Sequence, residues 1–545
     1  MSQPNSKVKQ SGRCSTASQP IPFESLLKQF NKQKGSVTKS EKKATAVMNF
    51  NDMIQTHQRP IDAYNMAIAL APPNSRVLAD AYIKRAEVAN HMSILKAATR
   101  NLELVKQCPN NEDALTFANE LEIIDECSSA LMEYRLYDFI NIKPFELSGK
   151  ANHKIPFILD CLKLVKEENG SVHLVTTKEL NVGDVLAIEN PVFSSAVWNS
   201  SYTYCSNCAQ SKPFELIPCT GCSLAMFCSE KCRDEAMQGF HQYECSVLLK
   251  IAGSFFHNEA YRLIFIALRF FFKMLEKFNG SCGALKSFMN KMKAKQQTLF
   301  DFDFSNLSEE KAKRKKLEAF CGTRQQLMFN QAFVEEQSKD LETFVSLFPA
   351  MQEIMKSHKN FVVKFLLEHS FYVNESGRAN TTNIGYVYSL CTLRSYLTHS
   401  CAPNVTILSI TAGKVLYMVR SVPVEAGGKL TICHTNREFI HYNRKFRNKN
   451  MRLKFIYACE CIACTKKYPS IQDMNIKDEE IVEAAKQIVS KLMTPEYQRE
   501  IKKNNKAIQK IARVYPCKST FVLDLVNSNM TRSIVHHLEI LESFR

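Results

Sequence analysis

The pattern of apolar and polar positions predicts a polar start followed by helices. Residues 1–44 are rich in Ser, Gln, Asn and Lys and hold few apolar side chains. Such a composition cannot bury enough surface to offset the entropy of ordering the chain, so we expect a flexible polar tail. From residue 45 the apolar residues recur at helical spacing, and we predict a helical region over residues 45–150.

One stretch of this region, residues 79–109, carries a more specific pattern. Aromatic, small and apolar residues stand there at nearly the spacings of a tetratricopeptide repeat. They are Tyr82, Ala86, Ala98, Leu102, Val105 and Pro109. Residues 63–73 look like the closing helix of another such repeat. The pattern predicts a tetratricopeptide-like layer, with an unrelated helical hairpin as the alternative.

The period changes from helix to strand at residues 171–193, where β-branched residues flank a turn at Asn181 to Asp184. This segment predicts a β-hairpin. A cysteine-rich block follows at 205–245, and residues 246–370 return to a helical period. The segments NVTILSI and GKVLYMVRSV then alternate as strands do.

Helical and strand segments interleave along the chain, which predicts an α+β fold. The pattern suggests a tail at 1–44, helices at 45–150, the first part of a sheet domain at 165–200, a metal block at 205–245, a helical insertion at 246–370, a sheet core at 371–438, a cysteine-bearing tail at 439–468 and a helical C-terminal region at 469–545.

The composition is that of a globular protein with excess positive charge. Apolar residues make up 45% and charged residues 23%, and 71 basic against 54 acidic side chains give a formal net charge of +17. The cations are spread over residues 311–316, residues 444–454 and the N-terminal tail, which is typical of a solvated surface. Contact with nucleic acid or an acidic partner is the alternative.

The first residues are polar, and the longest apolar run, residues 263–275, carries Arg269. We therefore expect neither a secretory signal nor a membrane span, but a soluble protein of the cytoplasm, the nucleus or both. In such a reducing compartment the 20 cysteines do not form a disulfide framework. Clustered cysteines are therefore expected to bind metal or to act in redox chemistry.

Four short pairs of metal-binding residues stand within 205–245. Their spacings are C-x2-C, C-x2-C, C-x3-C and H-x3-C. The pairs are Cys205 and Cys208, Cys219 and Cys222, Cys228 and Cys232, and His241 and Cys245. Zinc takes four thiolate or imidazole ligands in a tetrahedron, so these residues predict two closed structural sites rather than one catalytic site with an open position.

A second cluster, formed by Cys459, Cys461 and Cys464, leaves a zinc ion one ligand short. Cys401, in the segment YLTHSCAPNV, stands far from any other cysteine pair and would complete a third site. Two alternatives remain for Cys401. The first is a nucleophile with His399 as its base, although no third group to orient that base is evident. The second is a buried inert thiol.

The cysteine block closely resembles the MYND zinc finger. That resemblance implies an interleaved arrangement, in which the first and third pairs share one ion and the second and fourth pairs share the other. The segments THSCAPNV, VEAGGKLTICH and RNKNMRLKFIYACECIAC follow in the order of a SET domain with a zinc-bearing post-SET tail.

A MYND finger inserted after the first SET hairpin is typical of the SET and MYND domain-containing (SMYD) family. The N-terminal layer resembles the tetratricopeptide-bearing branch of that family. The resemblance implies a SET β-fold with an inserted finger, flanked by N-terminal tetratricopeptide-like and C-terminal helices, with three structural zinc ions.

Members of that family transfer a methyl group from S-adenosylmethionine to a protein lysine, and the chain matches their site in part. Matching positions are His399, Ser400, Cys401, Pro403, Asn404 and Arg447. His434 stands at the usual catalytic tyrosine, either as a substitute hydrogen-bond partner or as a strand-end histidine without chemistry. Thr398 replaces the asparagine that anchors the cofactor. Ser171, Val172 and His173 replace a Gly-x-Gly turn.

Three more positions complete the candidate site by the same resemblance. His399 belongs to the cofactor-binding segment. Tyr457 stands where the family places an aromatic residue against the cofactor, and Phe455 stands where a second tyrosine lines the lysine channel. Simple packing within the post-SET tail is the alternative for both aromatic residues.

The resemblance implies a SET-type protein-lysine methyltransferase with weak S-adenosylmethionine binding and weakened or lost activity. The alternative is a catalytically degenerate adaptor that recruits partner proteins through its helical repeats and its finger, since MYND modules bind proline-containing peptides. Nucleic-acid binding by the finger is disfavoured, because phosphate contact needs clustered cations. The charges of the finger are Lys212, Lys231 and Arg233 against Glu215, Glu230, Asp234, Glu235 and Glu244.

Overall fold

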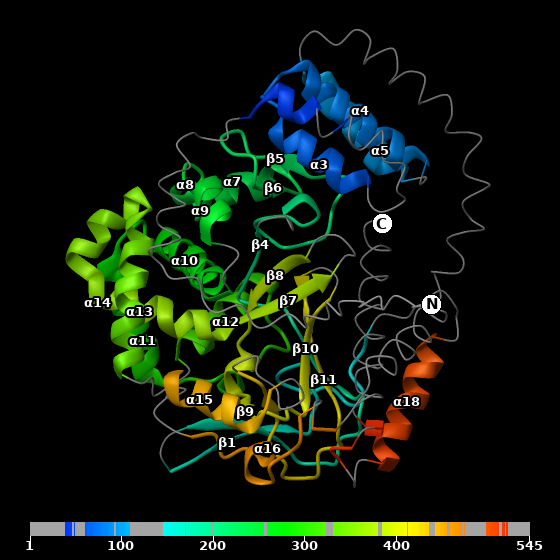
Figure 1. Cartoon of the computed structure of the whole chain (residues 1–545), viewed down its shortest axis with the longest axis vertical. Coiled ribbons are helices and arrows are strands. Elements are labelled where there is room, and N and C mark those ends of the chain that lie inside the picture. Colours follow the sequence, from blue (N-terminus) through cyan, green and yellow to red (C-terminus); the bar gives the residue numbers. More distant parts are fainter. Residues whose placement is uncertain are drawn as a thin grey trace, which may run out of the picture.

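The computed structural model describes residues 39–45, 48, 60–91, 94–108, 145–168, 171–197, 201–255, 259–322, 331–379, 384–410, 413–434, 442–454, 458–470, 473–474, 497–511, 515–517 and 519–520. Within these ranges the fold is mixed α and β, as the interleaved pattern predicts (Figure 1).

The N-terminal layer consists of α3 (Pro60–Leu70), α4 (Arg76–His91) and α5 (Leu95–Lys106). Helix α4 packs against both neighbours, and the small residues Ala86 and Ala98 are buried. Before α3, residues 41–45 are helical and Ala44 is fully buried. This short segment packs on the end of α3, where Ser40 N donates to Leu70 O at 2.7 Å.

The finger comes next in the chain and lies beside the N-terminal helices (Figure 1). Its elements are β5 (Ile217–Pro218), β6 (Met226–Phe227), α7 (Glu230–Gln238) and α8 (His241–Glu244). Apolar residues of the N-terminal helices, the finger and the helical insertion join in one buried cluster. The finger is thus packed between two helical regions rather than tethered to them.

The helical insertion contains the helices that its apolar period predicts. They are α9 (Leu248–Phe255), α10 (Glu259–Lys277), α11 (Cys282–Lys295), α12 (Glu309–Gly322), α13 (Gln331–Ser346) and α14 (Pro349–Tyr372), with a short 3-10 turn η2 (Leu299–Asp301). Helix α10 packs on α14. The ring of Phe270 on α10 stacks on Phe365 of α14 with centroids 5.8 Å apart, and Phe265 and Phe271 are fully buried.

The strands form several small sheets rather than one. They are β1 (Leu162–Lys166), β2 (Val172–Thr176), β3 (Val185–Glu189), β4 (Phe193–Val197), β7 (Val373–Ala379), β8 (Ile384–Leu390), β9 (Thr398–His399), β10 (Val405–Ser409), β11 (Val415–Val419) and β12 (Thr431–Ile432), with the 3-10 turn η3 (Leu393–Tyr396). The strand orders are β1-β2, β10-β11-β3, β12-β9, β4-β8-β7 and β5-β6.

The hairpin predicted for residues 171–193 is wrong. Its turn is present, because Asp184 N donates to Asn181 O at 3.0 Å and Gly183 takes a φ of +91°. Strand β2, however, pairs with β1, and β3 pairs with β11. Both strands found partners elsewhere in the chain, which alternation alone does not reveal.

The predicted start of the sheet domain is residue 165. It falls inside β1. Ile158 pairs with Ala187 in an isolated bridge and is buried in the same apolar cluster as β3 and β11. The segment before β1 has no strong period, so only its tertiary contacts place it in this core.

The C-terminal part contains α15 (Arg444–Lys454), α16 (Ile462–Thr465) and α18 (Tyr497–Ile511). Helix α18 lies on the Asn181 turn, where Gln509 Nε2 donates to Asn181 Oδ1. Most of the predicted helical region 469–545 lies outside the described residues.

Candidate metal centres and cofactor site

The first centre unites Cys205, Cys208, Cys228 and Cys232, whose sulfur atoms lie within 4.8 Å of one another. Cys228 Sγ lies 3.7 Å from Cys208 Sγ and 3.6 Å from Cys232 Sγ. A tetrahedral zinc ion with bonds of about 2.3 Å separates its sulfur ligands by about 3.8 Å, so the spacing fits zinc. Ser229 caps α7 by accepting a hydrogen bond from Cys232 N, which sets this pair at the helix start.

The donor chemistry also suits a divalent cation. Burial and the neighbouring thiols raise the pKa of Cys205 well above its ordinary value. Zinc favours the thiolate form of its cysteine ligands, so a bound ion would offset this cost of ionising Cys205. Zinc bound here would act as a structural ion.

The second centre unites Cys219, Cys222, His241 and Cys245, with ligand atoms again within 4.8 Å. The first and third pairs thus share one centre and the second and fourth pairs share the other, as the MYND resemblance implies. Gly221 has a steric role here. A Cβ at residue 221 would come within 2.8 Å of Cys245 Sγ, so only glycine fits this turn.

A buried carboxylate orients the histidine ligand of the second centre. Glu244 Oε1 lies 2.9 Å from His241 Nδ1, which leaves Nε2 on the side of the cysteines. Arg269 of α10 donates to both oxygens of Glu244, at 2.6 and 2.8 Å, and also to Ser195 Oγ at 2.6 Å. Burial alone would raise the pKa of Glu244, but the charge of Arg269 and the contact with His241 hold it below its ordinary value.

A carboxylate that contacts the other ring nitrogen fixes the orientation of a ligating histidine. Sequence reasoning did not select Glu244 or Arg269 for this role. The available signal was Arg269 itself, a charged residue in an otherwise apolar run, since an arginine in such a position needs a buried partner.

The third centre brings Cys401 to the distant cluster. Its four sulfur atoms, from Cys401, Cys459, Cys461 and Cys464, lie within 4.8 Å of one another. Cys401 Sγ is 3.8 Å from Cys459 Sγ and 3.7 Å from Cys464 Sγ. These separations match a zinc tetrahedron, and the donor set is that of a closed structural site.

The same geometry disfavours the two other interpretations of Cys401. His399 Nε2 does lie 3.5 Å from Cys401 Sγ, and burial lowers the pKa of His399 to about 4. The thiol, however, is buried and lies within 4.8 Å of the sulfur atoms of three other cysteines, which is the arrangement of a shared metal site. A metal there would hold the sulfur of Cys401 away from any substrate.

Arg447 of α15 packs against this centre. Its side chain is buried, and Nη2 lies 3.5 Å from Ala463 O and 3.8 Å from Cys464 Sγ. Asn448 Oδ1 lies 3.6 Å from the same sulfur atom. A cation beside four thiolates offsets the net negative charge that zinc alone leaves.

The candidate cofactor residues come together along one short strand segment. Leu430 N donates to Leu174 O at 2.9 Å, beside His173, and Leu430 O accepts from Thr398 N at 3.3 Å. Parallel pairing then sets Ile432 opposite His399. Asn404 holds this segment by accepting from Thr431 N at 2.7 Å and donating to Lys429 O at 2.9 Å.

Polar side chains surround Ser171 and His173, two of the candidate cofactor residues. Glu167 Oε1 lies 2.8 Å from Lys429 Nζ and 3.4 Å from His173 Nδ1, and Ser171 Oγ donates to the other oxygen at 3.0 Å. The hydrogen bonds from Lys429 and Ser171 lower the pKa of Glu167. Val172 pairs with Lys166 in the β1-β2 ladder.

His434 is tied to the backbone of the same region. Its Nε2 lies 3.0 Å from Leu397 O, and its own N–H donates to His399 Nδ1 at 3.2 Å. A carbonyl only accepts, so Nε2 carries the proton. The ring meets Phe371 edge to face at 5.1 Å. Burial, followed by the charges of His399 and Arg394, lowers the pKa of His434 well below its ordinary value.

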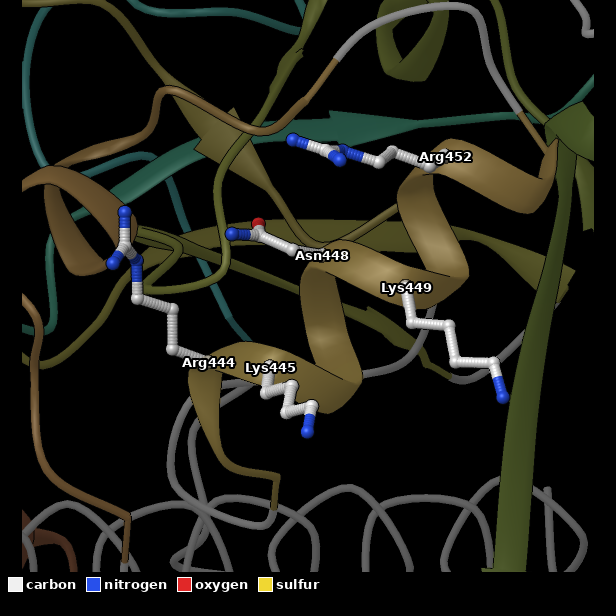
Figure 2. Close-up of a pocket in the computed structure, with 5 residues that line it drawn as sticks. All are labelled: Arg444, Lys445, Asn448, Lys449 and Arg452. Carbon is white, nitrogen blue, oxygen red and sulfur yellow. The ribbon is translucent and has the colours of Figure 1, made fainter.

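A basic cleft of about 750 Å³ lies beside the third centre. Its described lining comes from α15 alone: Arg444, Lys445, Asn448, Lys449 and Arg452. Figure 2 shows Arg444, Asn448 and Arg452 projecting from one side of the helix, and Lys445 and Lys449 from another. The adjoining face of α15 packs on the metal centre through Arg447 and Met451.

Comparisons with known proteins agree with this geometry. Residues 205–245 match the MYND finger family. The histone-lysine N-methyltransferase SMYD3 of Mus musculus is 25% identical over 313 residues, 57% of this chain and 63% of that protein. The human SMYD3 is 24% identical over 337 residues, 62% of this chain and 68% of that protein. These matches support membership in the SET and MYND domain-containing family.

A third relative matches a shorter stretch of this SET and MYND protein. The protein-lysine N-methyltransferase SMYD4 of Gallus gallus is 38% identical over 81 residues, which is 14% of this chain and 10% of the relative. The matches to the two SMYD3 proteins leave roughly a third of those proteins uncovered. What the relatives act on therefore enters only as a basis for proposals.

Two candidate residues of the SET and MYND site, Phe455 and Tyr457, lie outside the described residues. Glu167 and Lys429, which sequence reasoning did not single out, stand in contact with His173. In the described part of the chain, no helix has the length and apolar character needed to cross a membrane.

Proposed function

We propose that this SET and MYND protein is a slow protein-lysine methyltransferase that uses S-adenosylmethionine. Support comes from relatives that carry methyltransferase names and from the convergence of Thr398, His399 and His434 around the strand at Leu430. The position of His434 carries the prediction of slow turnover.

The chain's own groups would bind and orient the reactants. Backbone around Val172 and His173, together with Thr398, His399 and Tyr457, would hold the cofactor, which supplies an electrophilic methyl group when bound. The fit is partial, because Ser171 and His173 add side chains where the family has glycine and Glu167 engages both of them. We therefore propose weak cofactor binding.

His434 limits the positioning of the substrate amine. A tyrosine in the usual place offers a hydroxyl, whereas the His434 N–H donor at Nε2 is directed at Leu397 O. Loss of one positioned hydrogen bond at an active site typically costs about 2.7–4 kcal/mol, or roughly 10²–10³ in rate. A neutral imidazole at residue 434 thus keeps its place in the site but lacks the hydroxyl that aligns the substrate amine.

The second candidate function is a degenerate adaptor that recruits proteins through its finger and helical layer. The observation favouring it is the contrast between the three well-formed metal centres and the altered cofactor positions. A protein whose scaffold matters more than turnover would show this combination.

The cationic cleft on α15 bears on the choice of partner. Four of the five described lining residues are cations, and helix α15 as a whole carries six cations and no carboxylate. Such a face repels peptides rich in Lys and Arg and attracts acidic ones. We propose that the protein substrate or partner presents its lysine or its proline-containing segment in acidic surroundings.

We further propose the cytoplasm, the nucleus or both as the location, since reduced cysteines remain available to zinc there. Imaging of a tagged full-length chain tests this, and a secreted product would contradict it.

Calorimetric titration with S-adenosylmethionine, followed by mass spectrometry for methylated lysine, tests the proposed function. Weak binding with slow lysine methylation supports it. Absence of binding in a zinc-loaded, folded protein would favour the adaptor. Turnover on the order of 1 per second or faster would contradict the slow enzyme.

A further inference from the structure

Three helices of the N-terminal layer each place one fully buried polar side chain at a common point. They are Asn65 on α3, Arg85 on α4 and Asn101 on α5. Arg85 Nε donates to Asn101 Oδ1 and Arg85 Nη1 donates to Asn65 Oδ1, both at 2.7 Å. Because the guanidinium takes both amide oxygens, both amide NH₂ groups are left to donate elsewhere.

These donors hold the backbone of the finger. Asn65 Nδ2 donates to Pro213 O at 2.7 Å and to Tyr202 O at 2.6 Å. Asn101 Nδ2 donates to Phe214 O at 2.9 Å, and Arg85 Nη1 donates to Leu216 O at 2.7 Å. The helices thus bind backbone carbonyls of a turn segment, Pro213–Leu216.

The helices also contact one side chain of the segment. Phe214 is buried in an apolar pocket on the helices, where small alanines make room for the ring. The pocket residues are Ile61, Ala89, Ile94, Ala97 and Ala98. Side-chain donors to backbone carbonyls on one side and an aromatic pocket on the other are the components of a peptide-recognition site.

The recognition site has one donor in excess. Arg85 Nη2 is buried, and no residue in the described part of the chain accepts a hydrogen bond from it. Burial lowers the pKa of Arg85 to about 10, so the group stays charged at neutral pH. A buried cationic donor without an acceptor is costly in a fixed interface, which indicates that this surface suits a ligand with one more acceptor than Pro213–Leu216 supplies.

We propose that the surface around Asn65, Arg85 and Asn101 is a peptide-binding site for a Pro-Phe turn, and that the finger's own Pro213–Leu216 segment occupies it as a tethered ligand. The partner chemistry follows from the contacts: a short turn with proline before phenylalanine, outward carbonyls and an additional acceptor. This inference does not depend on methyl transfer.

The tether explains why the segment stays bound. Pro213–Leu216 lies between Cys208 of the first metal centre and Cys219 of the second, so zinc would hold both flanks. Contacts at the edges add to this, with Arg100 Nη2 at 2.6 Å from Glu230 and Thr203 Oγ1 donating to Asp62 at 2.8 Å. A tethered ligand has an effective concentration in the millimolar range and excludes weaker peptides in solution.

The test uses the full chain and a fluorescent peptide with the sequence of residues 211–218, SKPFELIP. Anisotropy titration compares wild type with Phe214→Ala, in which the tethered ring no longer fills the pocket. We expect the peptide to bind Phe214→Ala at least about tenfold more tightly than wild type, because the tethered competitor has been weakened. A peptide with alanine in place of phenylalanine is the ligand control.

A second variant separates the pocket from general loosening of the protein. Phe214→Ala combined with Ala97→Leu fills the pocket from the helix side and should abolish peptide binding. Zinc content and a cooperative melting transition verify folding of each variant. A folded, zinc-loaded Phe214→Ala protein that fails to bind the peptide overturns the proposal, as does wild type binding it equally well.

Discussion

Arg269 donates two parallel hydrogen bonds to Glu244, from Nη2 to Oε1 at 2.6 Å and from Nε to Oε2 at 2.8 Å. Both side chains are buried. Since Glu244 also contacts His241, this pair joins the long helix α10 to a metal centre of the finger. The finger and the helical insertion should therefore stabilise each other.

Replacing Arg269 with leucine should weaken both folding and zinc retention. The change leaves the Glu244 carboxylate buried without its cation, which typically lowers the free energy of unfolding by about 3–5 kcal/mol. Zinc affinity at the second centre should fall about 10–100-fold as His241 loses its orientation. Denaturant unfolding and zinc competition with a chelator measure these effects.

Lys273→Met is the matched control on the same helix. Lys273 pairs with Glu276 at 3.1 Å near the surface, and such pairs are worth about 0–1 kcal/mol. Equal losses in both variants would show that the buried pair has no special role.

Elemental analysis of the pure protein should find three zinc ions per chain, one for each cysteine-rich centre. Cys401→Ser should reduce this number to two, because the remaining three thiolates form an incomplete site. Cys433→Ser, which changes a half-buried cysteine outside the three centres, should leave it unchanged. A Cys401→Ser protein that retains all its zinc would refute the assignment of Cys401.

S-adenosylmethionine should bind only in the micromolar range or more weakly. Restoring the glycines with Ser171→Gly and His173→Gly should tighten binding about tenfold, or about 1.4 kcal/mol, because the backbone could then approach the ligand. Isothermal calorimetry measures both proteins. Glu168→Gln serves as a neighbouring surface control. Sub-micromolar affinity in wild type would show that the side chains at Ser171 and His173 do not obstruct the cofactor.

His434→Tyr combined with Thr398→Asn should raise automethylation or histone methylation. The phenol supplies the missing hydroxyl, and the amide supplies a separate donor and acceptor for the cofactor. Recovery should be partial, since the positions around Ser171 remain altered and a site needs its supporting residues. Methyl transfer from labelled cofactor is the readout.

The control for that double variant is His434→Phe with Thr398→Asn, which has a similar ring and no hydroxyl. It should stay well below the tyrosine variant, because any gain from the Thr398→Asn amide is present in both proteins and only the hydroxyl differs. If instead the tyrosine variant loses activity that wild type possesses, His434 is itself a working partner in an altered site.

Charge reversal on α15, by Lys445→Glu and Lys449→Glu, should weaken binding of acidic peptides and leave basic ones unbound or improved. Both lysines line the cleft in Figure 2. The difference should shrink as salt is added, because exposed charges are screened over about 8–10 Å at physiological ionic strength. Fluorescence anisotropy across ionic strengths tests this, and an effect that ignores salt would count against an electrostatic contact.

Local patterns accounted for the metal ligands and the helices. A C-x2-C pair closes a small ring around zinc whatever the rest of the chain does, so its spacing alone identifies Cys205 with Cys208 and Cys219 with Cys222. The apolar period over α10 predicts a buried helix for a similar reason, since side chains one turn apart share a face.

Strand pairing depended on distant segments. The alternation in β2 and β3 predicted strands correctly, and the Asn181 turn is present. Their partners β1 and β11 are nevertheless specified by packing across the domain, because hydrogen-bonding groups on a strand edge accept any complementary strand.

The sequence by itself determined which residues can bind zinc, where the helices run and which family the cysteine order resembles. Only the tertiary structure decided that Cys401 joins Cys459, that Glu244 and Arg269 support His241, and that Asn65, Arg85 and Asn101 are buried against the finger. By pattern alone, polar residues on a helix predict a solvated face, even where another segment covers them in the fold. Their role rests on long-range burial, which no local period encodes.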